Sequence, residues 1–180
     1  MERTLSHIAL FAALIAVLGL VPPITLISGV PITAQSLGIM LCGTVLGSRR
    51  GALAVGLFLL LVAAGLPILS GGRGGLGVFA GPSVGFLIGF PVAAFVAGLV
   101  VEHWKAPVGL AAAVGAALGG VIVLYAFGIP GMALMLDKTL AEASLLITAY
   151  LPGDAIKVVL AGMVTQSIAR MRPGSLLSRG

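Results

Sequence analysis

The chain alternates long apolar runs with short breaks that are polar or rich in glycine and proline. An apolar run of about 20 residues is long enough to cross the hydrocarbon core of a bilayer as a helix. The pattern predicts six such runs and leaves little sequence for a further domain. We therefore expect one all-α integral membrane domain over residues 1–180, a six-helix bundle with spans near residues 5–21, 34–47, 51–66, 83–101, 108–127 and 152–169.

The composition agrees with a membrane location. Hydrophobic residues make up 59% of the chain and charged residues 8%, whereas a soluble domain carries about 25% charge. A net charge of +5 would suggest a nucleic-acid partner in a soluble protein, but here it fits the bias of Lys and Arg towards the cytoplasm. The single cysteine, Cys42, excludes an internal disulfide and a cysteine-based metal cluster.

The distribution of basic residues predicts the orientation. If the N-terminus is inside and the spans alternate, seven of the ten bases are inside and three are outside. Both termini are then cytoplasmic. The inside bases are Arg3, Arg49, Arg50, Lys105, Arg170, Arg172 and Arg179, and the outside bases are Arg73, Lys138 and Lys157.

The stretch from Tyr150 to Lys157 brings an acid and a base into the start of the last span. Pro152 and Asp154 suit the first turn of a helix. Asp154 and Lys157 are three positions apart, so they share one helix face. Ionisable groups in a membrane helix are costly and mark a functional site. The alternative is an ion pair that only satisfies itself.

Two irregular segments fall on the same external side as this pair. Residues 22–33 contain three prolines, and such backbone must pack on protein or line a wet cavity. Gln35 follows directly, either capping its helix or projecting into that cavity. Residues 67–82 are rich in glycine and carry one charge, Arg73, which is either solvated or available to a carboxylate. No phosphate-loop signature is present. Together these segments predict external loops that form a ligand pocket.

Small residues also recur four positions apart in the apolar runs. Such spacing allows another helix to approach closely. In the first span it occurs twice, as Ala9/Ala13 and Ala12/Ala16, although alanine is common enough for the spacing to arise by chance. Gly85 and Gly89 form a GxxxG motif in the fourth span.

Three blocks of sequence carry a resemblance to a known family. They are Pro31-Ile32-Thr33-Ala34-Gln35-Ser36-Leu37-Gly38, the block from Gly65 to Pro82, and Tyr150-Leu151-Pro152-Gly153-Asp154 with Lys157. The chain resembles the BioY family, the biotin-specific substrate-binding (S) components of energy-coupling factor (ECF) transporters.

The resemblance implies high-affinity capture and uptake of biotin across the plasma membrane of a prokaryote, without enzymatic activity and without a cofactor or metal. A separate transmembrane coupling (T) protein and a pair of cytoplasmic ATPases would supply the energy, in agreement with the lack of a Walker motif. Helix faces such as Ala9, Ala12, Ala13 and Ala16 look like the surface offered to the coupling protein.

The chemistry of biotin then suggests roles for individual residues. Asp154 would accept from a ureido N–H, Lys157 would donate to the ureido carbonyl, and Arg73 would pair with the carboxylate. Gln35 would add a hydrogen bond, Tyr150 and Phe79 would pack on the rings, and Ser70 is a further polar candidate. The rivals are an S component for another vitamin such as thiamine, an intramembrane enzyme, and a membrane subunit without ligand.

Overall fold

A computed structural model describes residues 2–26 and 28–179, and within them the protein is almost entirely helical. The only β pairing in these ranges is two isolated bridges. Short 3₁₀ turns lie at Leu76–Ala80, Thr148–Tyr150, Pro173–Ser175 and Leu177–Arg179. The α-helices are α1 (Glu2–Leu18), α2 (Gln35–Leu46), α3 (Ser48–Ala63), α4 (Val84–His103), α5 (Val108–Ala117), α6 (Leu124–Met135), α7 (Leu140–Ile147) and α8 (Leu151–Met171).

Three helical stretches in the described residues are long and apolar enough to cross a membrane: Val84–His103, Val108–Met135 and Leu140–Met171. Thr4–Leu18 and Gln35–Leu46 are shorter apolar helices. Large apolar side chains such as Leu60 and Ile122 point outward, as expected where the surrounding solvent is lipid. The prediction of an all-α integral membrane fold is confirmed.

The fifth helical stretch is longer than the sequence pattern predicts. The predicted span ends near residue 127, but α5 continues through a π-helical turn, Leu118–Val123, into α6 and ends at Met135. Pro130 lies inside this helix without ending it, as is tolerated in membrane helices whose neighbours satisfy the freed backbone groups. The helix that connects this long stretch to α8 is the short α7.

Helix α7 begins at a capping box. The Thr139 backbone N–H donates to Glu142 over 2.8 Å, and the Glu142 backbone N–H donates to the Thr139 side chain over 3.2 Å. This reciprocal pairing satisfies two N–H groups that the first turn of a helix leaves free. It fixes the start of α7 and so helps to place the start of α8 that follows it.

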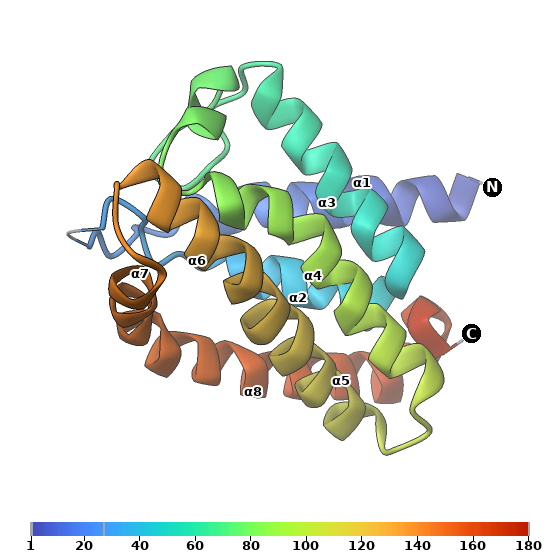
Figure 1. Ribbon diagram of the computed structural model, residues 1–180. Helices are drawn as coiled ribbons and strands as arrows, with labels where there is room; N and C mark the ends of the chain where they lie inside the picture. Colours follow the sequence, from blue (N-terminus) through green and yellow to red (C-terminus); the bar gives the residue numbers. More distant parts are fainter. Residues whose placement is uncertain (1, 27, 180) are drawn as a thin grey trace.

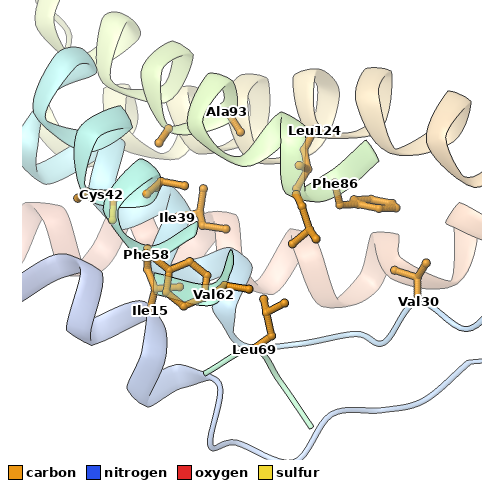
Figure 2. Packing of buried hydrophobic residues seen from close by; sticks show 14 of the residues in the cluster. Ile15, Val30, Ile39, Cys42, Phe58, Val62, Leu69, Phe86, Ala93 and Leu124 are labelled. Carbon is orange, nitrogen blue, oxygen red and sulfur yellow. The ribbon is translucent and has the colours of Figure 1, made fainter. Parts of the chain in front are cut away.

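Helix α4 lies at the centre of the bundle and packs on α2, α3, α5 and α6 (Figure 1). Glycines permit these close approaches: a Cβ built on Gly85 would lie 2.2 Å from the carbonyl oxygen of Phe127. The GxxxG motif is thus a packing surface for α6. Figure 2 shows the apolar interior between these helices, with Ile15, Ile39, Phe58 and Val62 packed together.

The small residues of α1 divide between two environments. Ala12 is buried and Ala16 is half-buried against the core, because this face of α1 packs on α2 and α3. Ala9 and Ala13 are exposed. Ala12 therefore does not reach the open surface of this chain, and within this set Ala9 and Ala13 present an exposed face.

The two ends of the bundle differ. The chain termini lie at one end, and the irregular segments gather at the other (Figure 1). The terminal end is rich in bases: Arg50 Nη1 donates to the carbonyl oxygen of Leu177, and Arg179 Nη2 donates to that of Trp104. The side chain of Arg3 lies outside what the structure describes.

Candidate functional site

A cavity lies at the end of the bundle where the irregular segments meet. Its walls come from the segment after α1, the start of α2, the glycine-rich loop, α4, α6 and the start of α8. Apolar side chains dominate the lining, and Figure 2 shows Val30, Leu69, Phe86 and Leu124 among them. Such a lining with a few polar groups is the usual form of a small-molecule site.

Asp154 and Lys157 form an ion pair at this cavity. Lys157 Nζ lies 2.9 Å from Asp154 Oδ1, and the side chains are 13% and 7% exposed for Lys157 and Asp154 respectively. Both residues belong to the beginning of α8, where Pro152 suits the first turn. Lys157 also donates to Ser36 Oγ of α2 over 2.8 Å. The predicted shared face of Asp154 and Lys157 is confirmed.

Tyr125 of α6 completes the polar group. Its hydroxyl donates to Asp154 Oδ2 over 2.6 Å, so both carboxylate oxygens are bound. Neither Tyr125 nor Ser36 was predicted as a site residue. A signal was available, because the chain has only two tyrosines, and a tyrosine hydroxyl in an apolar helix requires a partner. Ser36 follows Gln35 directly.

Tyr150 connects the irregular segment to the start of α8. Its hydroxyl donates to the carbonyl oxygen of Val30 over 2.5 Å and lies 3.0 Å from Ser28 Oγ. Its ring lines the cavity and stacks against Phe86, with 6.3 Å between ring centroids. Tyr150 is thus placed to contact a ligand's rings while its polar end fixes the loop.

Gln35 lines the cavity, but its amide is already bound to three backbone groups. Nε2 donates to the carbonyl oxygens of Ile15 and Ile68, each over 3.0 Å, and Oε1 accepts from the Ser70 N–H over 2.9 Å. The side chain is buried. Gln35 therefore ties α1 and the glycine-rich loop to the start of α2.

Arg73 is half-buried and borders two adjoining cavities. It lines the cavity of Asp154 and Lys157 and a second one beside Thr25 and Gly29. Its Nε donates to the carbonyl oxygen of Ser70 over 3.2 Å. Among the described residues Arg73 has no acidic partner, since the only ion pair there is Asp154–Lys157. Its charge is available to an anionic group of a ligand.

Two predicted site residues do not line this cavity. Phe79 instead borders an apolar groove with Leu5 of α1 and Leu60 of α3. Ser70 lines the adjoining cavity beside Thr25 and Gly29, where the residue is 1% exposed and its hydroxyl has no partner among the described residues. The reason in both cases is the path of the glycine-rich loop, whose 3₁₀ turn Leu76–Ala80 carries Phe79 away from α8.

Comparison with known proteins agrees with this geometry. The family model described as the BioY family matches residues 2–174. The "Biotin transporter BioY" of Rhodobacter capsulatus is 55% identical over 190 aligned residues, covering 100% of both chains. The "Probable biotin transporter BioY" of Bacillus subtilis is 42% identical over 165 residues, covering 91% of this chain and 89% of that one.

A solved structure shows the same fold. A crystal structure of "the S-component for biotin from an ECF-type ABC transporter" superposes with a TM-score of 0.89 at 31% identity, covering 94% of this chain and 92% of that one. Fold and sequence lead to one conclusion: this chain belongs to the BioY family.

Proposed function

We propose that this protein is the biotin-binding S component of an ECF-type transporter and that it captures biotin in the cavity at the loop end of the bundle. The observation that carries the proposal is the buried Asp154–Lys157 pair at an otherwise apolar cavity. Two relatives whose alignments cover 100% and 91% of this chain are named as biotin transporters, and this supports the same ligand.

The pair suits the ureido group, which has N–H donors and a carbonyl acceptor. Asp154 accepts from a ureido N–H, because each carboxylate oxygen can accept more than the one bond it has here. Lys157 donates to the ureido carbonyl. Tyr125 and Ser36 hold these two groups in place before the ligand arrives, which lowers the cost of ordering them on binding.

The remaining lining suits the rest of the ligand. Phe86, Leu124 and the ring of Tyr150 offer apolar surface to the fused rings. Arg73, which has no acidic partner among the described residues, pairs with the valerate carboxylate. Ser70 and Phe79 are not part of this proposed contact set.

The sidedness of the bundle sets the direction of transport. The base-rich end with the termini faces the cytoplasm of a prokaryote, and the cavity end faces outward. A separate T protein and ATPases supply the energy, and the exposed Ala9/Ala13 face of α1 is the proposed contact with that module. The S component itself has no cofactor or enzymatic role.

Calorimetric titration of the purified protein with biotin tests the site. Removing one member of a buried charged pair leaves the other unmatched at a cost of about 1–3 kcal/mol or more. We expect Asp154→Asn and Lys157→Ala each to weaken binding at least about tenfold. Lys138→Ala, which removes an exposed base at the same end, is the matched control. Unchanged affinity in both site variants, or equal binding of thiamine, would contradict the proposal.

A further inference from the structure

A polar groove lies at the opposite end of the bundle from the biotin cavity. It runs between the start of α3, the end of α4 and the C-terminal turns (Figure 1). Its apolar wall includes Phe95 and Leu99 of α4. Its basic rim consists of Arg49, Arg50, Lys105 and Arg179.

The positive charge of this rim is largely uncompensated. Arg50 and Arg179 donate to backbone carbonyl oxygens only, and Arg49 and Lys105 are exposed with no hydrogen bond or ion pair among the described residues. Glu102 is the only acid in the lining. Its carboxylate accepts from the N–H and the hydroxyl of Ser48, each over 2.7 Å, and so caps the start of α3.

The groove also opens sideways onto the lipid-facing surface. Phe95 is 36% exposed and lies eight residues before the end of α4 at His103, which is about 12 Å along the helix axis. Leu99, half-buried, lies one turn closer to the basic rim. Apolar helix surface thus leads directly into a cluster of bases at the level where headgroups are found.

We propose that this groove binds an anionic phospholipid, with the phosphate among Arg49, Arg50, Lys105 and Arg179 and an acyl chain along Leu99 and Phe95. Basic pockets between helices at the cytoplasmic face are suited to acidic headgroups. An acidic segment of a protein partner would match the rim, but it would leave the lipid-facing wall at Phe95 uncovered. The lipid accounts for both halves of the groove.

The lone tryptophan provides a direct readout. Trp104 is the chain's single tryptophan and lies exposed in the turn after α4, next to Lys105. The purified full chain in detergent is titrated with brominated phosphatidylglycerol or brominated phosphatidylcholine, and quenching of Trp104 emission is recorded. We expect phosphatidylglycerol to quench at lower concentration, and added salt to reduce this preference.

Two double variants with equal loss of charge test the location. Arg49→Gln/Lys105→Gln should reduce the preference for phosphatidylglycerol by about thirtyfold, which corresponds to about 2 kcal/mol for the loss of two bases near a headgroup. Arg170→Gln/Arg172→Gln removes two exposed bases from α8 and the residue after it, at the same end but outside the groove, and should leave the preference unchanged.

Three results would overturn the proposal. They are equal quenching by the two lipids, an equal effect of the two double variants, and complete reversal of quenching by inorganic phosphate. The last result would describe a simple anion site without a role for the acyl chain.

Discussion

The hydroxyl of Tyr125 donates a 2.6 Å hydrogen bond to Oδ2 of Asp154, across 29 residues of sequence. Lys157 binds the other oxygen of the same carboxylate, so the acid at the proposed biotin cavity is held from α6 and from its own helix. The carboxylate therefore has a fixed position before any ligand binds. The contribution of this fixed position to ligand binding can be measured by removing the Tyr125 hydroxyl.

Tyr125→Phe should weaken biotin binding by about tenfold, because a hydrogen bond to a charged group contributes about 1.5–3 kcal/mol and part of this is spent in holding Asp154 for the ligand. Calorimetric titration measures the change. Asp154→Asn combined with Tyr125→Phe should be little worse than Asp154→Asn alone, since both changes act on one carboxylate. Fully additive losses would show that Tyr125 acts independently of Asp154.

Arg73 should discriminate the charged end of the ligand. Arg73→Gln is expected to lower the affinity for biotin at least about tenfold, as expected on losing a charge-assisted hydrogen bond. The same variant should bind biotinamide, which lacks the carboxylate charge, as well as the unchanged protein does. If both ligands lose affinity equally, Arg73 supports the loop and does not bind the carboxylate.

Phe86 and Phe79 should behave differently when each is replaced by leucine. Phe86 lines the cavity and stacks on Tyr150, whereas Phe79 borders the apolar groove between α1 and α3. Phe86→Leu should weaken biotin binding several-fold through lost ring contact, and Phe79→Leu should leave it unchanged. Calorimetric titration of both variants with biotin measures the difference. A larger loss of affinity in Phe79→Leu than in Phe86→Leu would show that Phe79 contacts biotin.

Local parts of the site could be predicted from sequence, and contacts between distant segments could not. Asp154 and Lys157 share a helix, so their spacing alone gave their common face. Tyr125 reaches Asp154 from α6, the continuation of the helix whose α5 part packs on α8, and no local pattern specifies that pairing. The position of Phe79 outside the cavity could not be predicted, because the loop before it contains Gly72 and Gly75 at positive φ, and glycine leaves the direction of the chain open.

The fold, too, could be predicted where it depends on local sequence and could not where it depends on packing between helices. Hydrophobic runs located the helices, since each must be long and apolar to face lipid. They did not reveal that the helical stretch that begins at Val108 continues past residue 127 to Met135. Pro130 and several glycines lie in this stretch, and these residues interrupt helices in water. In the bundle those glycines are packing positions, as Gly131 shows against Gly85.

Gln35 should be more important for stability than for affinity. Gln35→Ala leaves two carbonyl groups and one N–H without their partner in a buried region, and each loss costs about 1 kcal/mol or more. A fall in melting temperature of about 5–10 °C is expected. Ser36→Ala, which removes an acceptor of Lys157 and a longer, 3.4 Å hydrogen bond to the carbonyl oxygen of Thr33, should cost less stability. A Gln35→Ala protein that melts normally but fails to bind biotin would assign Gln35 to the ligand.

Close packing at Gly85 should be sensitive to a single added methyl group. Gly85→Ala would place a Cβ 2.2 Å from the carbonyl oxygen of Phe127, and such overpacking costs about 1–3 kcal/mol. Gly56→Ala is the matched control, because a Cβ there meets nothing within 4 Å and alanine favours the helix by about 1 kcal/mol. Cys42, the only cysteine and fully buried, reports unfolding through its reaction with a fluorogenic maleimide during heating. Earlier labelling in Gly85→Ala and unchanged or later labelling in Gly56→Ala is expected, and equal melting of the two variants would show that α4 and α6 are not in close contact at Gly85.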